Sequence, residues 1–237
     1  MVNERSAVYL GLSLFFGLAL LGMQLADAAL DYRQLERRVT VKGLAEQEVM
    51  ADVVIWPIQF SAADDDLGQL YQTLEQQAEQ ISAFLLLNGI SETEISKAPP
   101  AITDRSAQQY GSREPNQLRF AALQTVTVYS NQIESVRAVM NKLAELGKQG
   151  IVFTGGDYQA QTEYLFTGLN SLKPTMVEEA TRNARDVAER FAKDSASRLG
   201  KIRCATQGQF SISSRDNNNP HIKKVRVVST VEYYLSD

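Results

Sequence analysis

The apolar residues of this chain form one long unbroken run, several alternating segments, and several segments with a three- or four-residue period. The unbroken run, VYLGLSLFFGLALLGMQL, covers the eighteen residues from Val8 to Leu25 and contains no charge. A helix of that length rises roughly 27 Å, close to the roughly 30 Å hydrocarbon thickness of a bilayer. The pattern therefore predicts a membrane segment, with apolar positions that include Val8, Leu12, Phe15, Phe16, Leu20 and Leu25.

Two interpretations of residues 1–30 remain open at this point. Ala26-Asp27-Ala28 fits the small-x-small pattern of a signal-peptidase site, so cleavage near Ala28 would leave a soluble periplasmic protein. However, the run is longer than an ordinary signal-peptide core, which favours an uncleaved single-pass anchor. In both cases Arg5 and the amino terminus are expected to stay in the cytoplasm and the rest to be exported. No cysteine follows the run, so a lipoprotein anchor is excluded.

Alternating or continuous apolar segments predict the strands of the exported part. Pro57, inside one of them, indicates an edge position or a bulge, and Pro99-Pro100 should interrupt another. The expected strands cover residues 38–43, 49–60, part of 90–103, 118–130, 151–153, 158–166, 202–214 and 222–235. In the last of these, Val225, Val227, Val231, Tyr233 and Leu235 share one side.

Apolar residues at three- and four-residue spacing predict three helices. Residues 67–87 should form one, capped by Asp64-Asp65-Asp66 and ended at Asn88-Gly89. Residues 132–146 should form the second, and residues 174–199 the third, stopped by Gly200. In the third helix a narrow face of small and apolar side chains should pack closely on a sheet: Val177, Ala180, Ala184, Ala188 and Phe191.

The order strand, helix, strand, strand occurs roughly twice along the exported part. This predicts an α+β fold with mixed or antiparallel sheets and packed helices, built from two similar halves without a linker. The expected organisation is a membrane segment at 1–30, a short stalk at 31–38 and one exported domain at 39–237.

Charge and composition exclude several classes of function. With 24 Lys and Arg against 28 Asp and Glu, the net charge is −4, and no basic cluster is long enough to favour nucleic acid as a partner. Cys204 is the only cysteine, so an intramolecular disulfide is impossible. One cysteine and one histidine, His221, cannot complete a four-ligand zinc site of Cys and His residues.

No group of residues stands out as a catalytic, cofactor or metal site. Cys204 lies in an expected strand and His221 in a polar loop, which predicts a buried thiol and a surface imidazole. Trp56 is expected in the core or at a strand edge. The Asp64–Asp66 run lacks the spacing of a calcium loop. Gly155-Gly156 lacks the Gly-Lys-Ser/Thr of a phosphate loop and is expected to form a hairpin turn.

Several motifs of the exported part resemble those of the SIMPL family of bacterial envelope proteins. The opening strand Val39–Gly43 is similar to the family's first strand. The next segment, Val49–Asp52, is also similar, but Ala51 stands before Asp52 where the family usually has proline. Similar too are three later segments: Leu87–Ile90, Glu179–Lys201 and Val231–Leu235. The resemblance covers residues 39–236 and implies an exported, often oligomeric protein, associated in some members with envelope stress or ring-like assemblies.

Together, these features predict a non-catalytic, membrane-anchored envelope protein that needs no cofactor and acts through self-assembly or through another envelope protein. The alternative is a small-molecule-binding or redox-protective enzyme that uses Cys204. A reactive cysteine would need an exposed thiolate beside positive charge, and Lys201 and Arg203 are the neighbours that could supply it.

Overall fold

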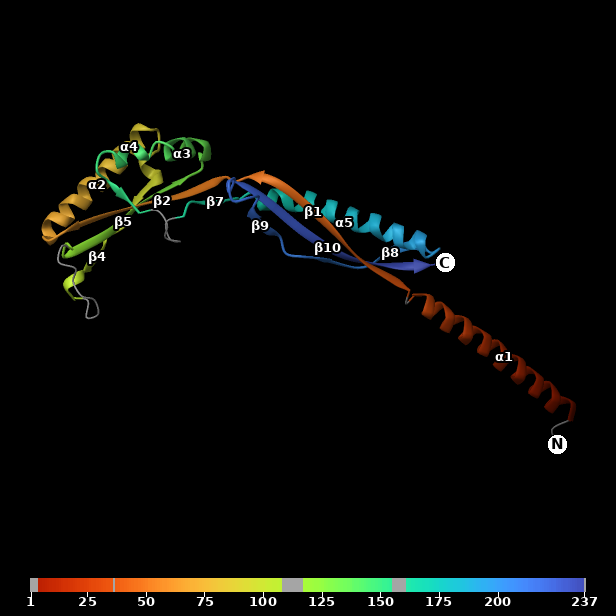
Figure 1. The fold of residues 1–237 in the computed structure, drawn as a ribbon. Helices are drawn as coiled ribbons and strands as arrows, with labels where there is room; N and C mark the ends of the chain where they lie inside the picture. Colours follow the sequence, from red (N-terminus) through yellow and green to blue (C-terminus); the bar gives the residue numbers. More distant parts are fainter. Residues whose placement is uncertain (1–3, 36, 108–116, 155–160, 237) are drawn as a thin grey trace. The chain divides into compact units, whose positions relative to one another are not determined.

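A computed structural model describes residues 4–35, 37–107, 117–154 and 161–236 (Figure 1). The chain forms two compact units, each made of separate stretches of sequence. Unit 1 contains residues 1–47, 172–211 and 226–237, and unit 2 contains residues 48–171 and 212–225. The predicted exported region 39–237 therefore comprises two units, and unit 2 is inserted between parts of unit 1.

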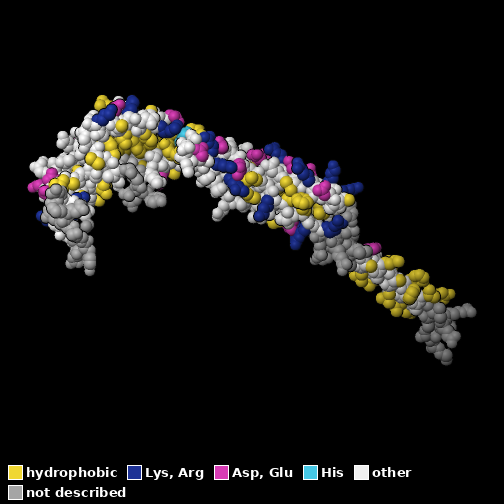
Figure 2. Space-filling view, viewed as in Figure 1, with side chains coloured by type: hydrophobic (Ala, Val, Ile, Leu, Met, Phe, Trp, Pro, Cys, Tyr) yellow, Lys and Arg dark blue, Asp and Glu magenta, His cyan; other side chains and the backbone are white. Residues whose placement is uncertain are grey.

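The apolar run lies within helix α1 (Glu4–Leu35). Residues Tyr9–Ala28 are long and apolar enough to cross a membrane, with a mean hydropathy of 1.7 and no burial against the rest of the described chain. Among the predicted membrane-facing residues, exposure is high at Leu12, Phe15, Phe16, Leu20 and Leu25. Figure 2 shows these hydrophobic side chains gathered along the helix. The helix continues through most of the predicted stalk.

The first sheet has the strand order β1-β10-β8, and β9 also pairs with β10. Its strands are β1 (Arg38–Met50), β8 (Arg198–Gln207), β9 (Ser211–Ser214) and β10 (Ile222–Ser236). Helix α5 (Leu169–Asp194) lies along β1 and β10 (Figure 1). Between them is a small core made of Val41, Ala184, Ala188, Val231 and Tyr233, with Val39 and Leu199 packed against it.

Helix α5 buries a narrow row in which each residue follows the last by four positions. The row is Met176, Ala180, Ala184, Ala188 and Ala192. Two predicted members of this face are corrected by the structure: Phe191 is 55% exposed, and Val177 is only partly buried. Phe191 follows Ala188 by three positions, and Val177 precedes Ala180 by three positions. Both side chains therefore lie at the margin of the buried row.

The predicted ends of α5 were also wrong. The helix begins at Leu169, so Pro174 lies inside it, and it ends at Asp194 rather than at Gly200. Ala196 adopts a left-handed φ of 51°. The amide of Ser197 donates to the Ala192 carbonyl at 2.8 Å, and that of Ala196 to the Lys193 carbonyl at 3.1 Å, which is the hydrogen-bond pattern of a Schellman cap. Leu199 and Gly200 therefore belong to β8.

The second sheet is built around β2 (Val53–Asp64) and has the order β3-β5-β2-β6, with β4 on β5 and β7 on β2. The other strands are β3 (Ile95–Lys97), β4 (Ala101–Asp104), β5 (Phe120–Ser130), β6 (Val152–Phe153) and β7 (Glu163–Leu165). Helices α2 (Leu67–Leu87), α3 (Ile133–Met140) and α4 (Ala144–Gly147) lie on one side of it (Figure 1). The core between them includes Trp56, 5% exposed, and Phe60, 0% exposed.

Pro57 lies inside β2, whose register with β5 runs without a bulge from Val54 to Asp64. The predicted bulge is therefore absent. On the other side of β2, β7 pairs with Val53–Ile55 and β6 with Phe60–Ser61. Pro57 falls in the interval between these two partners, where its missing N–H costs no ladder hydrogen bond. The strand is interior, and in the described part of the chain no residue pairs with it on this side at Pro57.

Helix α2 (Leu67–Leu87) has the predicted bounds because its signals are local. The Asp66 side chain accepts the Gln69 amide at 2.9 Å, which caps the first turn. Gly89 takes a φ of 89°, and the Ile90 amide donates to the Leu85 carbonyl at 3.0 Å. Its buried face comprises Leu70, Leu74, Ala78, Ile81 and Leu85.

The predicted helix at 132–146 is divided into α3 (Ile133–Met140) and α4 (Ala144–Gly147). Between them the amides of Lys142 and Leu143 donate to carbonyls three residues earlier, at 2.9 and 3.2 Å, which tightens the turn and ends the α-helical ladder. Short 3₁₀ turns occupy η1 (Glu92–Glu94) and η2 (Arg105–Ala107). Residues 108–116, and the predicted turn at Gly155-Gly156, lie outside the described residues.

The two sheets repeat one topology. In the second, β2 is followed by α2, then by β3 and β4, and both pair with the later β5 beside β2. In the first, β1 and α5 are followed by β8 and β9, and both pair with the later β10 beside β1. The predicted α+β class with two strand-helix-strand-strand halves is confirmed. The halves interleave, because all the strands of the second sheet come after β1 and before α5 in the sequence.

Candidate functional site

Strand β8 of the first sheet is exposed along most of its length. All of its residues are exposed except Leu199 and Gly200, which are partly buried. Among the described residues it pairs with β10 alone, so its other edge is open. An open edge presents unpaired backbone N–H and C=O groups to another strand. Ile202, 49% exposed, adds apolar surface to this edge.

Cys204 lies on this strand and is exposed, so the prediction of a buried thiol was wrong. Its partner in the β8–β10 register is Glu232. Arg203, one of the two cations expected to support a thiolate, donates to the Glu232 carboxylate at 3.0 Å. That carboxylate also lies 3.2 Å from Arg38 of β1. The guanidinium of Arg203 is therefore paired with Glu232, whose carboxylate links β8, β10 and β1, three of the four strands of the sheet.

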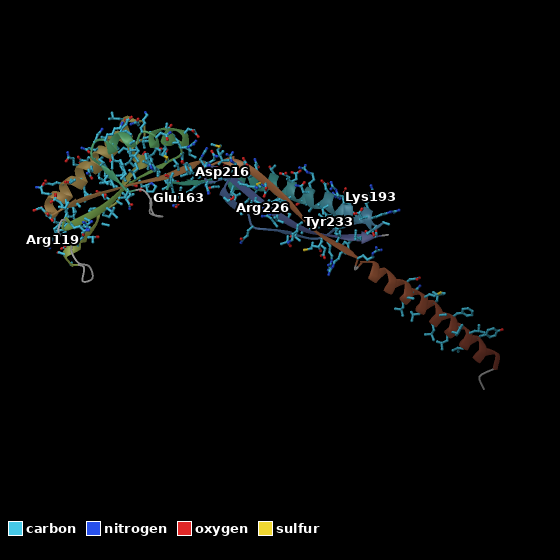
Figure 3. The ribbon with its side chains drawn as sticks, in the orientation of Figure 1. Arg119, Glu163, Lys193, Asp216, Arg226 and Tyr233 are labelled. Atoms are coloured by element: carbon cyan, nitrogen blue, oxygen red, sulfur yellow. The ribbon has the colours of Figure 1, made fainter. Side chains whose placement is uncertain are left out.

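The open face of the first sheet is polar. Besides the Arg38–Glu232–Arg203 group, Arg226 of β10 lies 3.5 Å from Glu46 of β1. Figure 3 shows Arg226 and Tyr233 on the same strand. Tyr233 belongs to the α5 side of β10 and is 1% exposed, and this burial raises the pKa of its hydroxyl. Charged pairs on one face and a closed core on the other leave the edge of β8 as the surface best suited to strand pairing.

His221 is buried in unit 2, with 6% exposure, so its predicted surface position was wrong. Its Nε2 lies 3.3 Å from Nη1 of Arg137, and Arg137 is paired with Glu134 at 3.2 Å. The Tyr164 ring meets the imidazole edge-on, with centroids 6.0 Å apart. Burial, followed by the charge of Arg137, lowers the pKa of His221, and burial raises that of Tyr164. The imidazole is therefore neutral at neutral pH and accepts a hydrogen bond from Arg137.

One signal in the sequence could have placed His221 correctly. His221, Lys223 and Val225 precede Val227 at two-residue steps, so they continue the inward-facing side of the last strand toward its start. All three are buried. Lys223 is 9% exposed; its Nζ donates to the Ser214 hydroxyl at 3.0 Å, and burial lowers its pKa. These groups lie in unit 2, whereas Cys204 lies in unit 1, so the two units hold the chain's single imidazole and its single thiol separately.

The aspartates at the start of α2 have structural partners. Asp64 accepts the Asp66 amide at 2.8 Å, and Asp65 accepts the Arg119 amide at 2.8 Å. Within the described residues, no group of three or more His, Cys, Asp or Glu side chains is placed to hold a metal ion.

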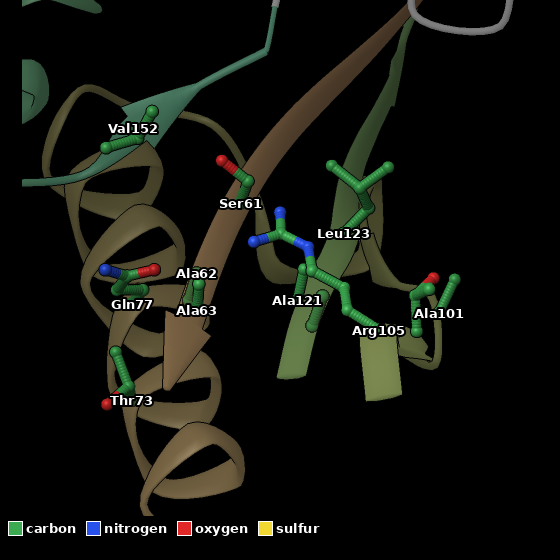
Figure 4. A pocket seen from close by; sticks show the side chains of 12 residues that line it. Ser61, Ala62, Ala63, Thr73, Gln77, Ala101, Arg105, Ala121, Leu123 and Val152 are labelled. Carbon is green, nitrogen blue, oxygen red and sulfur yellow. The ribbon is translucent and has the colours of Figure 1, made fainter. Parts of the chain in front are cut away.

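A groove lies at the end of the second sheet where β2 and β5 meet α2 (Figure 4). Its volume is about 600 Å³, and its lining includes Ser61, Ala63, Gln77, Ala101, Arg105 and Ala121. We refer to it as the β2–β5 groove. Sequence patterns did not reveal it, because its lining comes from four strands, a helix and a 3₁₀ turn that only the sheet register brings together.

The comparison with protein families agrees with these landmarks. The family model SIMPL, described as a protein of unknown function (DUF541), matches residues 39–232. This range begins at the start of β1 and ends within β10, so it includes both sheets and the helices packed on them. No match to a curated protein was found. The chain, an N-terminal apolar helix followed by two interleaved halves of one topology, belongs to the SIMPL family.

Proposed function

We propose that this chain is a membrane-anchored envelope protein whose SIMPL domain acts by pairing with further copies of itself. The observation that supports this most directly is the open edge of β8, ten residues long and exposed along nearly all of its length. A soluble domain usually shortens or covers such an edge. Helix α1 would raise the local concentration by holding copies in one membrane, which favours even a weak interface.

The charges on β8 favour one mode of pairing over another. Arg198, Lys201 and Arg203 are basic, and the strand contains no acidic residue. Two β8 edges facing each other would bring like charges together, which destabilises a strand pair. The first sheet has a second terminal strand, β1, which contains both acidic and basic residues. We therefore propose that β8 of one copy pairs with β1 of the next, a head-to-tail contact that gives a ring when its rotation closes.

The full-length protein in detergent, and the region 31–237 without detergent, are expected to form a discrete multimer at all but the lowest concentrations. The double variant Ile202→Lys with Cys204→Lys should shift both to monomer, because added edge charges repel an incoming strand. Both side chains are exposed, so the fold should be retained. Light scattering coupled to gel filtration measures the mass of each species.

The matched control is Leu86→Lys with Leu87→Lys, which adds the same charges at residues that are 47% and 88% exposed on α2. This variant should keep the mass of the parent. A parent protein that is monomeric in both forms at every concentration would remove the assembly proposal, and binding to a different envelope protein would then be the better hypothesis. A multimer that survives the β8 substitutions would place the interface elsewhere.

The single exposed cysteine provides a direct test of membrane sidedness. If the domain is periplasmic, a maleimide that cannot cross the inner membrane should label Cys204 in cells whose outer membrane alone is permeabilised. Cys204→Ser should remain unlabelled and serves as the control. Mass spectrometry of the labelled protein should find residues 8–25 retained if α1 is an anchor. Labelling that requires disruption of the inner membrane would contradict the periplasmic assignment, and a mature N-terminus at Ala29 would contradict the anchor.

A further inference from the structure

The only histidine of the chain is held against a cation inside unit 2. His221 immediately precedes β10 and is 6% exposed, and its Nε2 lies 3.3 Å from Nη1 of Arg137 on α3. A guanidinium has hydrogen-bond donors alone, so Nε2 is the acceptor and the imidazole is neutral, with its proton on Nδ1. A second proton on the ring would remove this acceptor and place two positive charges at hydrogen-bond distance. The contact therefore exists in only one protonation state of His221.

The two sides of this contact differ in their freedom to move. The backbone carbonyl of His221 accepts the Ala51 amide at 2.8 Å, and the ring of Tyr164 on β7 packs edge-on against the imidazole. The next inward-facing side chain of the strand, Lys223, is a base rather than an acid. The Arg137 side chain, by contrast, is 37% exposed. A repelled guanidinium can therefore turn toward water, whereas the imidazole can reach water only if the start of β10 moves.

The other charged groups around His221 form pairs of opposite sign. On α3, Glu134 lies 3.2 Å from Arg137, and in the turn before β10, Asp216, labelled in Figure 3, lies 2.8 Å from Arg215. Each carboxylate favours a proton on the imidazole, and each arginine opposes it. Because each carboxylate is already bound to its own arginine, neither is left to pair with an imidazolium. Burial, followed by the charge of Arg137, lowers the pKa of His221.

We propose that His221 and Arg137 form an acid-sensitive link between the start of β10 and α3, which breaks when the imidazole takes up a proton. Arg137 then turns to water with Glu134, and the imidazolium, buried without a carboxylate of its own, draws the start of β10 toward solvent. Because the pKa of His221 lies below its ordinary value of 6.5, the stability that this site contributes is complete above pH 6.5. It is lost as the pH falls from 6.5 to the pKa of the folded state. The link lies within unit 2 and does not depend on the proposed self-assembly.

Because His221 is the only histidine, its titration can be followed directly by NMR of the imidazole signals in full-length protein without a histidine tag, in detergent. The midpoint should lie below 6.5. Arg137→Met should raise it, since the opposing charge is removed. The control Arg190→Met, at an exposed position of α5 in unit 1, should leave it unchanged. A midpoint at or above 6.5 in the parent, or one that Arg137→Met does not raise, overturns the proposal.

Hydrogen exchange followed by mass spectrometry measures the loosening itself. After correction for the intrinsic effect of pH, amides of residues 212–225 and 133–140 should lose protection in the parent on going from about pH 7.5 to about pH 5. The loss can reach about thirtyfold, the limit for a group whose pKa in the open state is the ordinary 6.5. His221→Gln retains an acceptor for Arg137 but does not titrate, so its loss should be several times smaller.

The amides of α2 are the internal reference, and Trp56 fluorescence shows whether unit 2 is folded in each variant. Should His221→Gln fail to fold, the NMR titration of the parent and of Arg137→Met still decides the question. No loss of protection in the parent, or equal losses in the parent and a folded His221→Gln, would show that His221 does not control the start of β10.

Discussion

Gly43→Ala is expected to lower the free energy of unfolding of unit 1 by about 3 kcal/mol, a large fraction of the stability of an ordinary domain. A Cβ at this position of β1 would overlap the Ala180 carbonyl oxygen and the Ala184 nitrogen of α5, and would lie 2.9 Å from the Ala184 Cβ. Two of these atoms belong to the helix backbone, so no side-chain rotation can relieve the overlap. The side-chain amide of Asn183 also donates to the Leu44 carbonyl at 2.8 Å, which holds the helix at this distance from the strand.

The measurement is chemical denaturation followed by a fluorophore attached to Cys204, which lies on β8 in unit 1. Gly147→Ala is the matched control, because a Cβ there would meet no atom within 4 Å. It should leave stability unchanged or raise it by a few tenths of a kcal/mol. If Gly43→Ala were as stable as the parent, the close approach of α5 to β1 would be wrong.

Elements with local stop and start signals were predictable to the residue. In α2, Asp66 caps the first turn and Gly89 accepts the left-handed φ that ends the helix, and both residue types are the favoured ones for these positions. In α5 the left-handed residue is Ala196, a type that rarely adopts this conformation. The sequence therefore has no terminator before Gly200, and the prediction continued the helix into what is β8.

Burial in the strands depended on sheet order, which alternation does not specify. Cys204 is exposed because β8 is the last strand of its sheet and α5 covers mainly β1 and β10. His221 is buried because its strand passes into unit 2, where Tyr164 and Arg137 enclose the imidazole. Both errors came from judging one residue by its immediate neighbours in sequence.

The β2–β5 groove illustrates what single-strand patterns omit. Ala63 and Ala121 are unremarkable in their own segments, and only the register of β2 with β5 places them opposite each other on one face. The burial of the Gln77 side-chain oxygen, which has no hydrogen-bond partner among the described residues, likewise becomes visible only in the folded structure. The fold class, by contrast, was accessible, because the order of the predicted helices and strands already contains a repeated strand-helix-strand-strand pattern.

Leu85→Ala should lower the free energy of unfolding of unit 2 by about 2–5 kcal/mol, whereas Leu87→Ala, two residues later in the same helix, should change it by about 0.5 kcal/mol or less. The two side chains are identical in type and differ in environment: Leu85 is 0% exposed within the core of unit 2, and Leu87 is 88% exposed. Removing the first leaves a cavity and loses buried apolar area, and removing the second does neither. Trp56, the only tryptophan, lies in the same core, so its emission reports the unfolding of unit 2 directly. Equal losses in the two variants would mean that α2 does not present the Leu70–Leu85 face to the sheet.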